Sequence, residues 1–207
     1  MMRAAGVSLV LLLLHPAASL AQISVRGFGD VGLTVFNATQ SFKAILGKPS
    51  GPVYGGGIEL GQRRLFLSLG AQRFRKTGHR VFVFENQVFP LNVSDTITVT
   101  PVELTGGYRF RTSGRFLPYG GFGGSWIKFK ETSAHSTEAD DVSETHAGYH
   151  VLGGVEVPMQ RWLSAAVDAQ WSSVPNALGN ATTSVASVYD EHNIGGFTLR
   201  AKIIIGR

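Results

Sequence analysis

The chain has 207 residues, a length that suits one domain. It contains no cysteine, which excludes disulfides, thiolate metal sites and a cysteine nucleophile. The formal net charge is +5, but Lys and Arg form no runs and no nucleic-acid-binding motif is present, so we expect no nucleic-acid partner. With 43% hydrophobic residues, disorder is not expected either.

The first 21 residues have the pattern of a secretory signal peptide. Arg3 supplies the positive charge, residues 4–14 form an apolar run, and Ser19 and Ala21 are the small residues that signal peptidase recognises. The apolar run is shorter than the roughly 20 residues that a membrane-spanning helix needs. We therefore expect cleavage after Ala21 and a mature β-barrel domain over residues 22–207.

From residue 23 onward the dominant pattern is an alternation of period two, which is the period of a β-strand. One set of alternate positions is apolar, and the other holds small, polar and charged residues. The pattern predicts about eight strands, near residues 23–35, 53–62, 65–72, 102–110, 116–130, 147–157, 163–171 and 197–205.

The strand near 116–130 has a mixed alternation. Tyr119, Ile127 and Phe129 fall on its apolar side with Leu117, opposite Lys128, while the aromatic residues at 122 and 126 fall on the polar side. A β-bulge among the glycines at 120–124 would shift the register and explain this mixture. We therefore predict a bulge in this strand.

The connections between the predicted strands alternate in length. Short turns near 62–64, 111–115 and 159–162 separate long segments near 38–52, 75–95, 131–145 and 173–192. Transmembrane barrels have this asymmetry, with tight periplasmic turns and longer extracellular loops. The second long segment contains an alternating run at 80–84, which predicts a hairpin that projects above the membrane.

Alternation defines two faces of the sheet and leaves two kinds of barrel to be compared. A soluble lipocalin-like carrier places the apolar set inside, around a ligand. An outer-membrane barrel places that set against lipid. The apolar set carries no charge, and aromatic residues lie near the predicted strand ends, where interfacial girdles are found. This favours the membrane barrel, with girdle residues that include Tyr54, Phe110, Tyr119, Phe129 and Trp171.

The polar set then faces the interior of the barrel, and it contains both signs of charge. An eight-stranded barrel is just wide enough for side chains to fill it, and an isolated buried ion costs several kcal/mol. We therefore predict a connected ion network that plugs the barrel, centred on Glu103, Arg109, Glu156 and Arg200. Its predicted members are Arg26, Asp30, Glu59, Glu103, Arg109, Glu156, Asp168, Arg200 and Lys202.

The third long segment and the strand after it are rich in histidine and acidic residues. This set could bind a divalent cation, but it has no defined ligand spacing, so a solvated acidic loop is favoured. No recognisable nucleophile motif is present. The sequence therefore predicts no catalytic, cofactor or metal site. The set comprises His135, Glu138, Asp140, Asp141, Glu144, His146 and His150.

From about Gln22 to Arg207 the chain resembles the small outer-membrane β-barrel family typified by the OmpA transmembrane domain and OmpX. The resemblance rests on strand count, alternation, loop asymmetry and segments such as Thr-Gly-Gly-Tyr-Arg-Phe at 105–110 and Leu-Pro-Tyr-Gly-Gly-Phe-Gly-Gly at 117–124. It implies an all-β, closed antiparallel up-and-down transmembrane β-barrel in the bacterial outer membrane. It also implies a monomer in contact with outer-membrane lipid, lipopolysaccharide and the outer-membrane assembly machinery. Family members commonly end their last strand with an aromatic residue that this machinery recognises. The last strand here has no such aromatic residue, and Ile205 is the expected substitute.

The resemblance implies a structural or surface-interaction role for an outer-membrane barrel with exposed extracellular loops. A narrow channel for small solutes or ions and a soluble lipocalin-like carrier remain as alternatives. The family also includes a few lipid-modifying enzymes, but without a nucleophile motif we expect no enzymatic activity.

Overall fold

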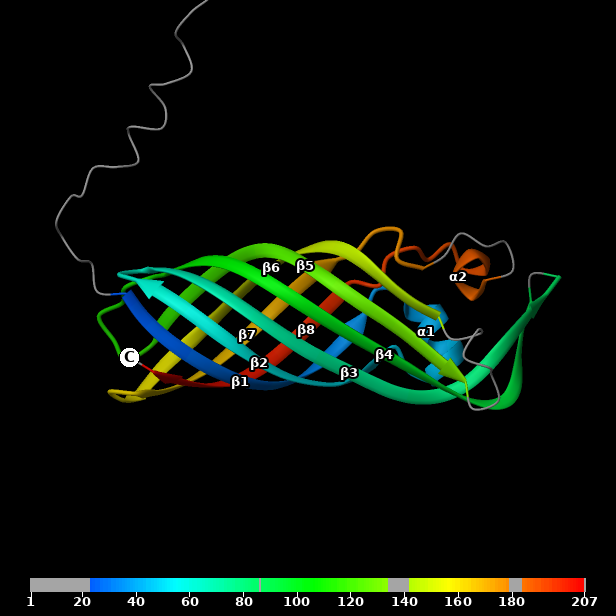
Figure 1. The fold of residues 1–207 in the computed structure, drawn as a ribbon, viewed down its shortest axis with the longest axis horizontal. Helices are drawn as coiled ribbons and strands as arrows, with labels where there is room; N and C mark the ends of the chain where they lie inside the picture. The colour runs from blue at the N-terminus through cyan, green and yellow to red at the C-terminus, as the bar shows by residue number, and fades with distance from the viewer. Residues whose placement is uncertain (1–22, 86, 134–141, 179–183, 207) are drawn as a thin grey trace, which may run out of the picture.

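The computed structural model describes residues 23–85, 87–133, 142–178 and 184–206, so the predicted signal peptide lies outside the described residues. Within them, eight antiparallel strands form a closed barrel in which β1 pairs with both β2 and β8 (Figure 1). The predicted all-β barrel of about eight strands is confirmed. The strands are β1 (Ile23–Phe36), β2 (Ser50–Gln62), β3 (Leu65–Phe84), β4 (Gln87–Arg109), β5 (Leu117–Ser133), β6 (Val142–Gln160), β7 (Leu163–Ser173) and β8 (Gly196–Gly206), and the helices are α1 (Thr39–Leu46) and α2 (Val185–Val188).

The two ends of the barrel differ (Figure 1). At the turn end, residues 63–64, 110–116 and 161–162 join successive strands. At the loop end lie α1, α2 and the far ends of β3 and β4. Most of the segment at 75–95 is strand, because β3 and β4 remain paired as far as Phe84 and Gln87, with one register shift between His79 and Val81. The outer parts of these two strands form the projecting hairpin that the alternation predicted.

The outer face of the barrel carries an apolar band. Val167 is 54% exposed and Leu67 is 48% exposed, although both side chains are aliphatic. A continuous apolar surface of this kind requires a lipid environment. Exposed aromatic side chains border the band at both ends. Those at the turn end are Phe110, Phe116 and Trp162, and those toward the loop end are Tyr54, Trp126, Tyr149, Trp171 and Phe197.

The band ends before the strands do. On β3, the outward residues that follow Ala71 are Arg73 and Arg75, and on β5 Lys128 follows Trp126; all three basic side chains are exposed. The strand segments between these residues and the loop end therefore extend beyond the hydrocarbon layer.

The predicted faces of β5 are wrong. Tyr119, Ile127 and Phe129 are buried inside the barrel, whereas Phe122 and Trp126 are exposed on its outer face, with Lys128 beyond the band. The pairing of β5 with β4 and β6 shows no register shift, so the predicted bulge is absent. The reason is that the inner face of β5 is apolar near the loop end, so both faces carry hydrophobic side chains there.

Apolar side chains fill the loop-end half of the interior, and we call this group the apolar cap. Helix α1 contributes Phe42, whose ring stacks on Phe36 with centroids 4.3 Å apart, and Phe74 packs edge-on against Phe36 at 4.9 Å. The buried cap residues larger than alanine are Phe36, Phe42, Leu46, Val53, Phe74, Ile97, Val99, Ile127, Phe129, Val174 and Ile194.

Helix α1 is fixed in the mouth of the barrel by the connection between β7 and β8. The carboxylate of Glu191 accepts hydrogen bonds from the backbone amides of Gln40 and Ser41, at 2.9 and 2.8 Å, in the first turn of the helix. A negative charge at this position also favours the helix dipole. Gly78 of β3 allows the close approach of α1, because a Cβ there would lie 2.0 Å from the carbonyl oxygen of Ile45. No helix in the described part of the chain is long and apolar enough to cross a membrane.

Candidate functional site

The charged residues of the inner face form the candidate site, and near the turn end four of them make a closed cluster. Arg26 of β1 donates to Glu59 of β2 at 2.6 Å and to Glu156 of β6 at 2.6 Å. Arg109 of β4 donates to the same two carboxylates, at 2.7 Å to Glu59 and 3.1 Å to Glu156. Two cations and two anions from four strands thus satisfy one another. We call this the turn-end cluster.

A second cluster lies deeper in the barrel and is organised around Asp168 of β7. This carboxylate accepts from the Nε of Arg200 at 2.7 Å and contacts the ammonium of Lys202 at 2.5 Å. The hydroxyl of Tyr119 donates at 2.9 Å to Oδ2, the same carboxylate oxygen that Lys202 contacts. Asp168 and Arg200 are 1% and 3% exposed, so the pair is shielded from bulk water. We call this the mid-barrel cluster.

Glu103 of β4 extends the mid-barrel cluster. It accepts a 2.6 Å hydrogen bond from the side-chain amide of Gln170 and a 3.4 Å ion pair from Arg200. His150 lies in the same part of the barrel, where its Nε2 is 2.8 Å from the hydroxyl of Thr105. It is 1% exposed, so this histidine belongs to the barrel interior and is separate from the acidic loop with which the sequence grouped it.

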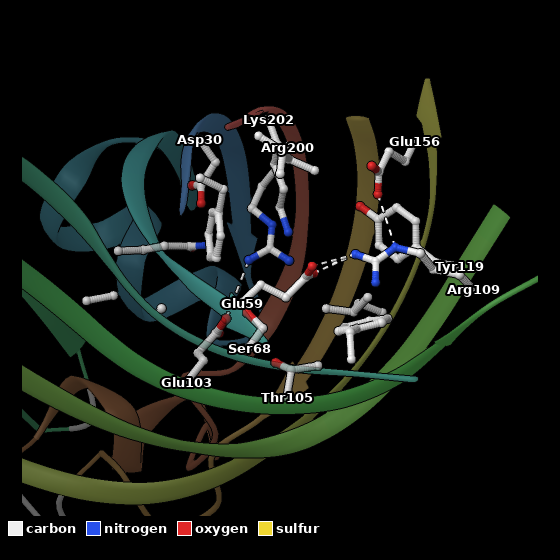
Figure 2. A pocket seen from close by; sticks show the side chains of 17 residues that line it. Asp30, Glu59, Ser68, Glu103, Thr105, Arg109, Tyr119, Glu156, Arg200 and Lys202 are labelled. Atoms are coloured by element: carbon white, nitrogen blue, oxygen red, sulfur yellow. Dashed lines mark hydrogen bonds and ion pairs between the residues drawn. The ribbon is translucent and has the colours of Figure 1, made fainter. Parts of the chain in front are cut away.

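The structure places all nine predicted residues on the inner face, but it distributes them differently from the prediction. Arg109 and Glu156 belong to the turn-end cluster, whereas Glu103 and Arg200 belong to the mid-barrel cluster. No ion pair between described residues joins the two clusters. The single connected network that the sequence predicted is therefore divided into two. Figure 2 shows Arg109 and Glu156 on one side of the cavity between the clusters, with Arg200 and Lys202 on the other.

Asp30 is the one predicted member without a partner of its own. It is 5% exposed, and among the described residues neither of its carboxylate oxygens has a hydrogen-bond partner. Lys202, which lies opposite Asp30 on the neighbouring strand β8, contacts Asp168 instead. The cavity beside Asp30 offers about 40 Å³, which is room for a few water molecules.

The inner set contains one more acidic residue than basic residues. The acidic members are Asp30, Glu59, Glu103, Glu156 and Asp168, and the basic members are Arg26, Arg109, Arg200 and Lys202. Five carboxyl groups therefore face four permanent cations, and the other four carboxylates all have ionic partners. Asp30 is thus the residue best placed to carry a proton or to use water in the cavity.

Sequence reasoning missed two side chains that complete the mid-barrel cluster. Gln170 belongs to the polar set of alternate positions, but its side chain is uncharged, so there was no reason to predict its hydrogen bond to Glu103 from the sequence. Tyr119 was placed on the lipid face. The unbroken parity from Phe122 to Lys130 was the signal that could have turned Tyr119 inward, because without a bulge Phe122 and Trp126 face lipid and the opposite parity, which includes Tyr119, faces the interior.

A divalent-cation site in the histidine-rich and acidic segment finds little support in the described residues. They contain no group of three or more His, Cys, Asp or Glu side chains arranged to hold a metal ion. His146 of the predicted acidic loop bonds to Glu144 at 3.0 Å. His135, Glu138, Asp140 and Asp141 lie outside the described residues. The arrangement as a whole is a barrel whose interior contains two ionic clusters and an apolar cap.

Comparison with known proteins assigns the family. The model of the outer membrane protein beta-barrel domain matches residues 7–194. The chain belongs to this outer-membrane β-barrel family. No curated protein gives a significant match. Family membership places the protein in the bacterial outer membrane and rules out the soluble lipocalin-like carrier.

Solved structures show the same fold. The crystal structure of Neisserial surface protein A matches with a TM-score of 0.55 and 13% identity, covering 88% of this chain and 96% of that chain. A major outer membrane protein from Thermus thermophilus matches with a TM-score of 0.51 and 11% identity, and the match covers 90% of this chain and 100% of that chain. At these identities the comparison shows a shared fold.

Proposed function

We propose that this protein is a closed outer-membrane barrel with a structural or surface-interaction role, and that its loop end lies at the cell surface. The observation that carries the proposal is the filled interior, in which the apolar cap follows the two ionic clusters along the barrel axis. A filled barrel leaves the exposed ends as the places where binding occurs. Loops held on a rigid scaffold are where binding residues are usually found, and the longer connections all lie at one end.

Charge at the loop end supports lipopolysaccharide as a partner. Arg73, Arg75 and Lys128 are exposed just beyond the aromatic border of the apolar band. Anionic head groups of the outer leaflet would lie at this level if the loop end faces outward, and opposite charges attract there. We propose that the protein is a monomer and that it is inserted by the outer-membrane assembly machinery, as its family resemblance implies.

We also propose that residues 1–21 are removed on export, leaving a mature chain that begins at Gln22. The support is the charged, apolar and small-residue pattern of this segment. The intact mass of the protein purified from outer membranes checks it. A mass that includes Met1 would contradict the proposal.

A narrow channel is the alternative function, and no feature of the described residues favours it. An ion that crossed the barrel would have to lose its hydration among the phenylalanine and aliphatic side chains of the apolar cap, and hydrophobic constrictions of this kind block conduction. The proposal likewise includes no catalytic step.

Single-channel recording in planar bilayers tests this part of the proposal. The purified protein should give no conductance steps, while its heat-dependent migration on gels shows that it is folded. The variant Phe74→Ala thins the apolar cap at a residue that is 1% exposed, and it serves as the matched control in which leakage would arise first. Reproducible steps from the unmodified protein would support the channel instead.

A further inference from the structure

The loop end contains a pocket above the apolar cap. Its volume is about 360 Å³, within the range of small-molecule sites. Helix α1, the β3–β4 hairpin, the loop ends of β5 and β6 and the segment around α2 line it. The apolar part of its lining includes Phe42, Ile45, Val81, Val83, Ile97 and Phe129.

One wall of this pocket carries two carboxyl groups, of which one is fully buried and the other partly buried. Asp95 of β4 is 1% exposed, and Glu131 of β5 shares a hydrogen bond with it, so one of the two carries a proton at this contact. Burial and the neighbouring Asp95 raise the pKa of Glu131 to about 7. Both residues lie beyond the apolar band, on segments that extend past the lipid. Carboxyl groups in an apolar pocket are costly to ionise, and a cation beside them would offset that cost.

We propose that this pocket binds a small amphipathic amine, with its apolar body on Phe42 and Phe129 and its ammonium group at Asp95 and Glu131. The inference deepens the proposed function, and it rests on that function in taking the loop end as the binding end. A free metal ion would leave the apolar walls unused. An anion would meet three carboxyl groups, from Asp95, Glu131 and Glu144, and a single cation, Arg80.

Binding of the amine should strengthen as the pH rises through about 7. Above that pH Glu131 is ionised, while an alkylamine with a pKa near 10 stays charged. The charged groups that face this wall are Asp95 from β4, Arg80 from β3 and Glu144 from β6, and α1 adds no charged side chain to the described lining. The titration of Glu131 therefore sets the pH dependence.

Three matched probes test the ligand class: phenylbutylamine, phenylbutanol and phenylbutyrate, titrated by NMR into the full-length protein in lipid nanodiscs. Above the pKa of Glu131, which is about 7, only the amine should bind well, and Glu131→Gln should weaken its binding about tenfold, as expected for loss of one hydrogen bond between charged groups. Asp190→Asn, at a carboxylate whose side chain is 96% exposed outside the pocket, should leave binding unchanged. Equal binding of all three probes, or binding of none, would overturn the proposal.

The location is tested by Ile45→Trp, which fills the pocket from α1 and should abolish amine binding. Amine binding that survives this substitution in a folded barrel would also overturn the proposal. These titrations use purified protein, so they do not depend on which end of the barrel faces outward. If the amine binds but the loop end is found to face the periplasm, the binding pocket stands and only the proposed surface role is refuted.

Discussion

At the scale of single residues, the inner face contrasts a carboxylate that is fully paired with one that has no partner. Glu156 is 2% exposed and binds both Arg26 and Arg109. If it were removed, two guanidinium groups would have to share Glu59 in a region with little access to water. Asp30 is also buried, but it has no hydrogen-bond partner among the described residues.

We therefore expect opposite results from two substitutions of buried acids. Glu156→Ala should lower the free energy of unfolding by about 3–5 kcal/mol, because it leaves buried positive charge without a partner. Asp30→Asn should leave the free energy of unfolding unchanged or raise it, since the amide replaces a buried carboxyl group that makes no hydrogen bond among the described residues. Urea unfolding in phospholipid vesicles measures both. Equal losses from the two variants would mean that the charge of Asp30 is in use.

Glu131 predicts how stability at the loop end depends on pH. Its pKa is raised by burial and by Asp95 to about 7, above the ordinary value of 4.5, so the folded protein holds a proton that the unfolded chain releases. Between these two pKa values the folded state binds more protons, and stability must fall as the pH rises. Its stabilising contribution is complete below the ordinary pKa and is lost as the pH rises through about 7.

The variant Glu131→Gln isolates this effect. It should flatten the decline in unfolding free energy between about pH 5 and pH 8, because the amide does not titrate. Urea unfolding at several pH values in that range provides the measurement. A decline that persists unchanged in the variant would assign it to another group.

At the scale of the elements, the eight strands were predictable from the sequence, but the inward and outward faces of β5 were not. Strands such as β7 alternate between aliphatic and polar residues, and both of its faces were assigned correctly, with Val167 outward and Asp168 inward. The pattern loses its contrast in β5, where Ile127 and Phe129 join the apolar cap while Trp126 faces lipid. Period-two reasoning needs a polar inner face, and the loop-end half of this barrel does not provide one.

The apolar band makes a prediction that distinguishes lipid from water on the outer face. Val167→Arg should lower the free energy of unfolding in vesicles by about 2–4 kcal/mol, because the residue lies in the middle of the apolar run of β7. Thr98→Arg, outward on β4 but beyond the band, should cost far less. Urea titrations of the two variants in vesicles compare them. A harmless arginine at Val167 would mean that this face does not meet lipid.

At the scale of the whole molecule, the fold class was predictable because closure follows from the chemistry of the membrane. Hydrocarbon offers no partners to backbone groups, so membrane-spanning strands must close on themselves. The inward direction of the nine charged residues follows from the same alternation. Their partners do not, because Arg26 meets Glu156 across the barrel, 130 positions away in sequence, and that contact depends on how the closed sheet is staggered.

The central claim is that a filled barrel presents its loop end to the outside of the cell. The chain has no native cysteine, so single cysteines can report on orientation without interference. Gln87→Cys lies in the tip of the β3–β4 hairpin, and Gly114→Cys lies in the β4–β5 turn, where an added Cβ meets no atom within 4 Å. A membrane-impermeant maleimide applied to intact cells should label Gln87→Cys and should reach Gly114→Cys only after the outer membrane is broken. Labelling of Gly114→Cys alone on intact cells would invert the orientation and contradict the account.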